Sequence, residues 1–587
     1  MNSEHSDQGL FRGRLLIGVV SSVTAANVRV NLHEAGAASG SMLNGARYGL
    51  GEVGEFAVVE SEHFALLGRI IEVRLPERDR HSLDHDSGAG VNVAAVAFIQ
   101  LLGTVTLDDM TIIAGVSSYP RLGDRVYSAP IEFLSTIPLR TGNSERPTVT
   151  LNLGRVSGAS DAAMEITPEK IFGRHCAILG ATGGGKSYTV SRLVEECLRY
   201  KSKLILLDAT GEYRNFKSAT KHLHLGNPTA ASDKSNKCSV PPASFNELDF
   251  MALFEPAGKS QGPKLRAAIR SLRLIAILPE LASQEKPKLL VRSNRAKKDI
   301  LSAERKKDIS KKLDDPSTPF DVTQLVAQIV EECVYETGGS FSNPDSTIWG
   351  GYNQNEVSYC MTLLSRINSV LSSRALECVF GDDQGPSVTT EIKSFLRSED
   401  RLLCISLEGI PFEYHAREII ANALGRYLLA EARGRVFQSC PLVVIVDEAH
   451  NFLGRSFGSE DSLARLDSFE LIAKEGRKYG LNLCLATQRP RDITEGVLSQ
   501  MGTLIVHRLT NDRDREVVER ACGEIDRSAS AFLPNLEPGE ATVVGVDFPI
   551  PLTIQIHEPS VRPDSKGAQF QEHWAIPKVA SNEPAGG

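Results

Sequence analysis

The clearest chemistry in this chain lies in residues 176–196, CAILGATGGGKSYTVSRLVEE, where a glycine run ends in lysine and serine. The spacing matches G-x-x-x-x-G-K-[ST] through Gly180, Gly185, Lys186 and Ser187. Glycine costs stability inside strands and helices, so bare backbone here must serve a purpose. In such a loop the backbone N–H groups surround phosphate oxygens, the lysine reaches the β- and γ-phosphates, and the serine holds Mg²⁺.

The flanking segments have the form that a phosphate loop needs. Residues 175–180, HCAILG, are typical of a short buried strand. After the loop, apolar side chains follow one helical stripe: Val190, Leu193, Val194, Cys197 and Leu198. Strand, loop and helix in this order favour an ATP-binding loop over a chance glycine-rich turn. We expect its nucleotide contacts to be Gly180, Ala181, Thr182, Gly183, Gly184, Gly185, Lys186, Ser187 and Tyr188.

Two carboxylates follow a second buried strand, in PLVVIVDEAHN at 441–451. Phosphoryl hydrolysis needs one acid near Mg²⁺ and another that orients the attacking water. Because strand ends beside the phosphate loop bring such groups together, Asp447 is predicted to share the metal with Ser187. Glu448 is then the predicted catalytic base.

Two more strands end in polar side chains. The segment LNLCLATQ ends at Gln488, where an amide can touch the γ-phosphate or its water. The alternative for Gln488 is a loop opener that bonds only locally. KLILLD ends at Asp208, which we also expect near the nucleotide.

Charge that develops on the γ-phosphoryl group is usually stabilised by an arginine, in cis or from a neighbour. Arg477 stands just before the strand that carries Gln488, where a ring-forming ATPase can present it to the adjacent subunit. Arg174, ahead of the phosphate-loop strand, is a second candidate. The alternative for either is an ordinary surface cation.

The patterning divides the 587 residues into several units. Residues 1–145 carry short β-rich runs split by Gly, Pro and polar turns, which predict a β-barrel. Strands alternating with helices at 146–215 and 401–560 predict an α/β core. Residues 216–400 are predicted to be an inserted, mainly helical subdomain, and residues 561–587 an extended tail.

Composition excludes several classes of protein. The net charge of −8 and pI of about 6.0 exclude a generally basic chain, so nucleic-acid binding must use local patches or the inside of an assembly. The ten cysteines contain no C-x-x-C pair, which argues against zinc sites and a disulfide framework. Without a signal-like start or an apolar run of about 20 residues, we expect a cytoplasmic protein.

One basic segment stands out at 286–312, with eleven Lys and Arg against three Asp and Glu. A DNA contact is one interpretation. A solvated helix face or a site for a partner protein is favoured, because no aromatic side chain interleaves to stack on bases.

Taken together, the motifs resemble the HerA branch of the HerA–FtsK P-loop ATPases. The resemblance is carried by GRHCAILGATGGGKS, LLDATGEY, VVIVDEAHNFL, EGRKYGL and LATQRPRDI. It implies a RecA-like core behind an N-terminal barrel, forming a hexamer that draws double-stranded DNA through its pore. Matching positions imply nucleotide-site roles for Arg174, Lys186, Ser187, Asp208, Glu448, Arg477 and Gln488.

The same resemblance implies a separate partner. Archaeal members work with the nuclease NurA on DNA ends, whereas bacterial members, whose long helical insert this chain shares, often work with a nuclease or sirtuin-like NADase in anti-phage defence. The effector is expected to dock on the barrel. A DNA motor and a ring scaffold that switches the effector both stay open, and a conjugation ATPase is a weaker third option.

Overall fold

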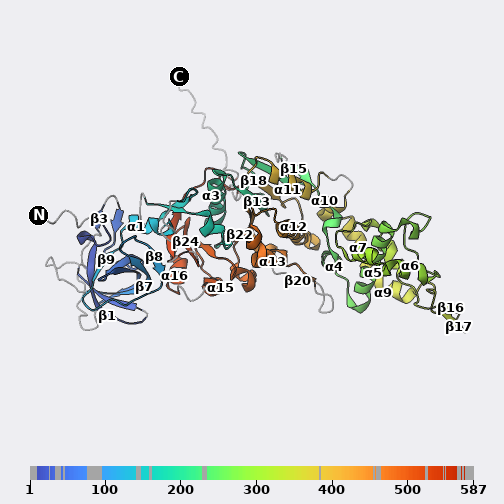
Figure 1. The fold of residues 1–587 in the computed structure, drawn as a ribbon, viewed down its shortest axis with the longest axis horizontal. Coiled ribbons are helices and arrows are strands. Elements are labelled where there is room, and N and C mark those ends of the chain that lie inside the picture. The colour runs from blue at the N-terminus through green and yellow to red at the C-terminus, as the bar shows by residue number, and fades with distance from the viewer. Residues whose placement is uncertain are drawn as a thin grey trace, which may run out of the picture.

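The structure is a computed structural model that describes most of residues 9–564, together with residues 570 and 574. Within 9–564 it leaves out residues 26, 34–40, 44–45, 76–94, 140–146, 158–161, 228–234, 341, 382–384, 454–455, 458–463, 523–526, 547 and 549. The molecule is elongated, with a β-barrel at one end, a helical segment at the other and a large sheet between them (Figure 1). Most of the predicted tail, 561–587, lies outside the described residues.

The N-terminal unit is a closed barrel. Its strands follow the order β2-β1-β9-β5-β6-β7, and a β2–β7 pairing closes the ring. Alternate side chains such as Val28 and Val30 point inward and are fully buried. The barrel strands are β1 (Leu16–Val23), β2 (Asn27–Leu32), β5 (Phe56–Glu60), β6 (Phe64–Arg74), β7 (Val96–Thr106) and β9 (Arg125–Ser128), and β8 (Ile112–Ala114) extends the sheet.

The central sheet has twelve strands. In spatial order these are β11 (Ala163–Ile166), β10 (Leu151–Val156), β25 (Leu552–Ile556), β24 (Glu540–Gly545), β23 (Thr503–Val506), β12 (Cys176–Leu179), β22 (Leu481–Thr487), β19 (Leu442–Val446), β13 (Lys203–Asp208), β18 (Leu402–Ser406), β14 (Thr220–Leu225) and β15 (Asn236–Cys238). From β23 to β15 the strands are parallel, and β24, β25, β10 and β11 join antiparallel. Continuous apolar runs such as LVVIV in β19 are what a sheet covered on both faces requires.

The sheet separates two hydrophobic cores. In β12, Ala177 and Leu179 face one core, and Cys176 and Ile178 face the other. The first core includes α4 (Glu247–Phe254), α5 (Gly258–Ile277), α12 (Ala416–Arg433) and α13 (Ser468–Glu475). The second includes α3 (Lys186–Leu198) and side chains of the barrel. Each end of the molecule is therefore packed against a different face of the sheet.

The helical segment confirms the predicted fold class but begins later than the sequence indicated. Strands β14 and β15, which fall inside the range predicted as helical insert, pair in the central sheet. Helices then run from α4 to α11 (Val388–Arg397) and include α6 (Lys297–Arg305), α7 (Lys307–Asp314), α8 (Leu325–Glu331) and α9 (Gln354–Leu371). We retain the division into domains as a proposal, with the insert starting after Cys238.

Within the described part of the chain, no helix combines the length and the apolar character that crossing a membrane requires.

Candidate nucleotide site

The phosphate loop joins the carboxyl end of β12 to the start of α3 and has an open backbone. Gly183 and Gly185 have φ angles of 77° and 105°, a region that side chains disfavour. At Gly180 a Cβ atom would lie 2.6 Å from Cβ of His507, so only glycine fits there. A Cβ at Gly183 would meet nothing within 4 Å. The loop thus leaves backbone accessible where phosphates bind in such folds.

Lys186 and Glu448 meet inside this site. The Lys186 Nζ atom lies 3.4 Å from Glu448 Oε1, and the two residues are only 5% and 8% exposed. Glu448 has φ 47° and ψ 45°, a left-handed conformation that is rare and costly for a residue with a side chain. The surrounding structure holds the carboxylate in this strained position beside the lysine.

Gln488 connects the phosphate loop to the same carboxylate. Its Nε2 donates to Glu448 Oε1, and its Oε1 accepts from the hydroxyl of Thr182. His450 Nδ1 lies 3.3 Å from Glu448 Oε2 and 3.2 Å from Thr487 Oγ1. Glutamine at this strand end therefore does more than open a loop, since it bridges the two elements that a nucleotide would touch.

Asp447 is buried and has an unusual proton affinity. Its Oδ1 has no hydrogen-bond partner. Burial raises the pKa of Asp447 well above its usual range, Lys186 opposes that rise, and the carboxylates of Asp208, Glu448 and Glu212 add to it. A buried acid among other acids gains from a nearby cation, which fits a place beside Mg²⁺.

Ser187 belongs to the same cluster. Burial raises the pKa of Tyr213 and the charge of Asp447 raises it further, whereas the nearby Ser187 side chain opposes the rise. Both predicted metal-side residues are therefore close enough to Tyr213 to influence its hydroxyl, which has no hydrogen-bond partner in the part of the chain that the structure describes. The described residues hold no group of three His, Cys, Asp or Glu that would cage a metal alone. Such a cage is not expected, because Mg²⁺ in nucleotide sites takes most ligands from phosphate and water.

The carboxylate of Asp208 is held by its own loop. Its carboxylate accepts backbone N–H groups from residues 210–213, at 2.7–3.3 Å. Burial raises its pKa to about 6, and these bonds oppose the rise. The side chain therefore holds the loop that carries Glu212 and Tyr213, and its place near the nucleotide stays a prediction.

The two candidate arginines lie away from the phosphate loop of their own chain. Arg174 precedes β12 and Arg477 lies in the turn Gly476–Tyr479 before β22, so both are at the amino ends of strands whose carboxyl ends form the site. Both side chains are exposed. His175, which follows Arg174 in the chain, has its pKa lowered chiefly by burial and also by the charge of Arg477.

Sequence reasoning missed residues that contact the loop from distant strands. His507, at the end of β23, is fully buried beneath Gly180. Gly539, before β24, contacts Gly185. The one available signal was position, since His507 follows a buried strand as Gln488 and Asp447 do.

Comparisons with known proteins find relatives of this chain. The family model described as "Helicase HerA, central domain" matches residues 151–426. A probable helicase of Methanocaldococcus jannaschii is 23% identical over 459 residues, covering 78% of this chain and 74% of that protein. The DNA double-strand break repair helicase HerA of Pyrococcus furiosus is 22% identical over 486 residues, covering 81% and 79%.

Two solved structures also align. The bacterial conjugative coupling protein TrwB is 16% identical with a TM-score of 0.41, covering 72% of this chain and 93% of that one. VirB4 of Thermoanaerobacter pseudethanolicus is 14% identical with a TM-score of 0.41, covering 71% and 98%.

Proposed function

Because this chain belongs to the HerA family of P-loop ATPases, we propose that it is a hexameric motor that uses ATP to move double-stranded DNA through its central pore. The observation that carries the proposal is the cluster of Lys186, Glu448 and Gln488 at adjoining carboxyl strand ends. Relatives named as DNA double-strand break repair helicases support DNA as the substrate.

The contacts suggest a sequence of roles at the nucleotide. Mg²⁺ bound with ATP would supply charge neutralisation at the phosphates, with Ser187 and Asp447 as the residues that hold it. Phosphate oxygens compete with Glu448 for Lys186, because each is an anion within reach of one buried ammonium. Freed from that pair, Glu448 orients the attacking water and accepts its proton.

Gln488 and the arginines complete the proposed site. Since Gln488 contacts both Thr182 and Glu448, a change at the γ-phosphate reaches the base through one side chain. Arg477, with Arg174 as the alternative, is proposed to stabilise the γ-phosphoryl group of the neighbouring subunit, because neither faces the loop of its own chain.

The motor proposal is tested with the isolated protein. ATP hydrolysis should rise when linear duplex DNA is added, and the protein should displace a third strand annealed to that duplex. The Glu448→Gln variant should bind DNA and ATP but neither hydrolyse ATP nor displace the strand. Hydrolysis that ignores DNA, with no strand displaced, would refute the motor.

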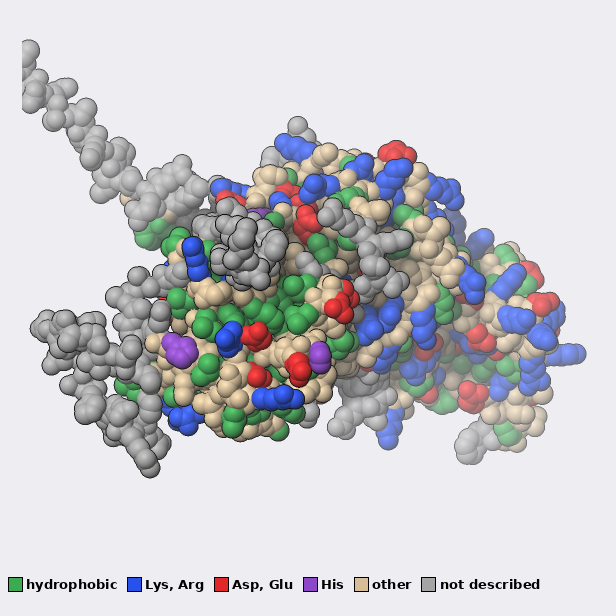
Figure 2. Space-filling model, turned by 60° about the vertical axis from the view of Figure 1, so that its left-hand side comes forward, with side chains coloured by type: hydrophobic (Ala, Val, Ile, Leu, Met, Phe, Trp, Pro, Cys, Tyr) green, Lys and Arg blue, Asp and Glu red, His purple; other side chains and the backbone are tan. Residues whose placement is uncertain are grey.

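We further propose a cytoplasmic complex with a separate effector, a nuclease or an NADase, that acts against phage. The barrel is the proposed docking unit because it exposes large apolar side chains, Val53, Ile113, Tyr119 and Leu122. Figure 2 shows hydrophobic side chains gathered on this end of the molecule among scattered charges. Burying exposed apolar side chains against a partner is favourable.

Co-expression with the neighbouring gene tests this second proposal. The pair should protect cells against phage, and Ile113→Asp with Leu122→Asp should release the partner while leaving ATP hydrolysis intact. If the scaffold alternative holds, effector activity survives in Glu448→Gln complexes. Lack of protection, with the partner still bound by the double variant, would refute both the defence role and the docking site.

A further inference from the structure

The phosphate loop rests on a turn that belongs to the far end of the chain. Residues 536–540 lead into β24, and the N–H of Gly539 donates to the carbonyl of Gly184 at 3.4 Å. A Cβ atom at Gly185 would lie 3.2 Å from Cα of Gly539. A shift of the loop backbone at Gly184 or Gly185 would therefore also displace Gly539.

His507 ties the same turn to helix α3. Its Nδ1 lies 2.8 Å from the carbonyl oxygen of Glu540, which can only accept, so Nδ1 carries the proton. Its Nε2 lies 2.8 Å from Thr189 Oγ1 and accepts that hydroxyl, because burial lowers the pKa of His507 to about 4 and keeps the ring neutral. One imidazole thus joins the first turns of α3 to the backbone of Glu540.

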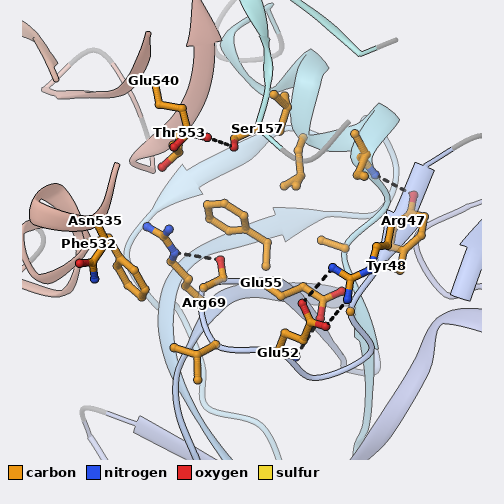
Figure 3. Close-up of a pocket in the computed structure, with 18 of the residues that line it drawn as sticks. Arg47, Tyr48, Glu52, Glu55, Arg69, Ser157, Phe532, Asn535, Glu540 and Thr553 are labelled. Atoms are coloured by element: carbon orange, nitrogen blue, oxygen red, sulfur yellow. Dashed lines mark hydrogen bonds and ion pairs between the residues drawn. The ribbon is translucent and has the colours of Figure 1, made fainter. Parts of the chain in front are cut away.

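The side chain of Glu540 points the other way, into the junction with the barrel. Its carboxylate accepts the hydroxyl of Ser157 and, at 2.9 Å, the N–H of Glu537. Both Ser157 and Glu540 line a pocket of about 520 Å³ between barrel and core (Figure 3). Glu540 therefore contacts the nucleotide site with its backbone and the junction with its side chain.

The barrel contacts this junction through Arg69. Its guanidinium stacks 3.9 Å from the ring centre of Phe532, a few residues before the turn, and its Nε donates to the Gly54 carbonyl at 3.0 Å. Arg69 comes from β6 of the barrel, and Figure 3 shows it directed toward Phe532. A cation stacked on an aromatic ring in a largely buried place is a specific contact, not incidental packing.

We propose that His507 and Glu540 are positioning residues of the ATPase site that couple nucleotide binding to the seating of the barrel. The proposal rests on the ATPase activity alone and not on DNA or an effector. Phosphates bound in the loop would fix the backbone of Gly184 and Gly185, which contact Gly539. The turn that contains Gly539 would then be held in place, and with it the contacts that Ser157 and Phe532 make at the junction. Coupling between two sites is reciprocal. If bound nucleotide stabilises the contacts between barrel and core by some factor, then weakening those contacts must lower the affinity for nucleotide by up to the same factor.

Reciprocity gives the first test. In Phe532→Leu and Ser157→Ala proteins, the dissociation constant for a fluorescent ATP analogue should change by at least about threefold. Arg74→Ala is the matched control, because Arg74 also stacks on an aromatic ring of the barrel, at 4.6 Å over Phe98, but is not part of the junction. In the wild type, the analogue should slow amide hydrogen exchange at residues 53–56 and 533–540, and less so in Phe532→Leu.

Unchanged affinity in both junction variants, with normal melting temperatures, would overturn the coupling. So would exchange at the junction that does not respond to nucleotide. Either result leaves the motor proposal standing, because DNA-stimulated hydrolysis is measured separately.

Two substitutions of His507 separate its two hydrogen bonds. His507→Asn places an amide N–H where Nδ1 stands and keeps the bond to Glu540, whereas His507→Gln reaches the Nε2 position and keeps the bond to Thr189. We expect the Asn variant to raise KM for ATP but keep the junction response. The Gln variant should lose the junction response, and by reciprocity its KM should shift in the same direction as the dissociation constant does in Phe532→Leu.

Thr189→Val removes the same hydrogen bond as His507→Asn, so their effects on KM should not add in the double variant. A role in folding alone would lower stability in all three proteins without this split of KM and junction response. That outcome, or wild-type behaviour in both His507 variants, would overturn the assignment.

Discussion

Arg477 and Gln488 stand at opposite ends of the same seven-residue strand, β22. At about 3.3 Å per residue the strand alone separates them by roughly 20 Å. Gln488 contacts the phosphate loop, so Arg477 cannot reach the nucleotide of its own chain. An arginine role for Arg477, as proposed above, therefore requires that it acts on the nucleotide of a neighbouring subunit.

We therefore expect complementation between inactive subunits. Rings mixed from Arg477→Ala and Glu448→Ala proteins should regain part of the hydrolysis, because some interfaces pair an intact arginine with an intact base. Steady-state ATPase rates of mixed hexamers, verified by native mass spectrometry, check this. Mixing Lys186→Ala with Glu448→Ala is the control, since both residues serve one subunit's site and no rescue is expected. Mixed rings as inactive as that control would show that Arg477 does not act in trans.

Loss of Lys186 and loss of Glu448 should abolish hydrolysis in different ways. Lys186→Ala removes a phosphate contact and leaves Glu448 as an unpaired buried carboxylate, so nucleotide affinity should fall at least about tenfold. Glu448→Gln keeps the shape of the side chain and frees Lys186, so ATP should bind at least as tightly as in the wild type and persist unhydrolysed. Equilibrium binding and single-turnover assays distinguish the two. Equal losses of affinity would contradict the assigned roles.

The basic segment 286–312 should contribute little to DNA-stimulated hydrolysis. Two of its cations are used inside the helical segment, Arg292 with Glu332 and Lys297 with Glu336. Most of the exposed ones lie on or beside α6 and α7, at the end of the molecule farthest from the barrel (Figure 1). Replacing Lys306, Lys307, Lys311 and Lys312 by Gln should leave DNA affinity and stimulation within about twofold.

The measurement is DNA-stimulated ATPase across a salt series. A large loss of DNA binding, with the hexamer intact and a shallower salt dependence, would instead make this surface a DNA contact.

His175 should make the wild type sensitive to acid. Its Nδ1 accepts the Leu483 N–H at 3.0 Å and its Nε2 lies 3.1 Å from the Ala473 carbonyl, so only the neutral ring satisfies both. Burial lowers its pKa to about 4 from 6.5. Between pH 6.5 and about pH 4, the His175 ring is protonated in the unfolded chain but stays neutral in the folded protein. Stability from this group is therefore lost as pH falls through that window.

His175→Asn is the comparison, because asparagine can accept from Leu483, tolerates the φ of 64° at this position and does not titrate. Relative to it, the wild type should lose about 2 kcal/mol by about pH 5. Denaturant unfolding of both proteins from pH 7 to 5 measures the difference. Asp208, whose raised pKa has the opposite effect, is common to both and cancels. Parallel curves would show that His175 is not held neutral.

Short sequence motifs were sufficient to predict which side chains meet beside the phosphate loop. Lys186, Glu448 and Gln488 each follow a continuous apolar strand, and parallel strands bring their carboxyl ends together, so their meeting was foreseeable. The backbone partners of Asp208 could not be predicted, because they are N–H groups of its own loop, which no side-chain pattern reveals.

The remaining misses share a different cause. Strand β14 begins with three half-buried residues, and β15 is only three residues long, so neither shows an apolar run, and both depend on pairing with distant β18 or each other. His507 and Gly539 reach the phosphate loop from more than 300 residues away. Tertiary pairing of this kind overrides local pattern.

The antiparallel pairing of β10 with β25 also sets an order of events during synthesis. Every strand of the barrel lies between residues 16 and 128, so the barrel can fold soon after it leaves the ribosome. Gly154 pairs with Ile556, about 400 residues later, and such non-local contacts form last. The turn beneath the phosphate loop arrives in that same final stretch. During synthesis, the residues of the barrel are therefore complete long before those that close the nucleotide site.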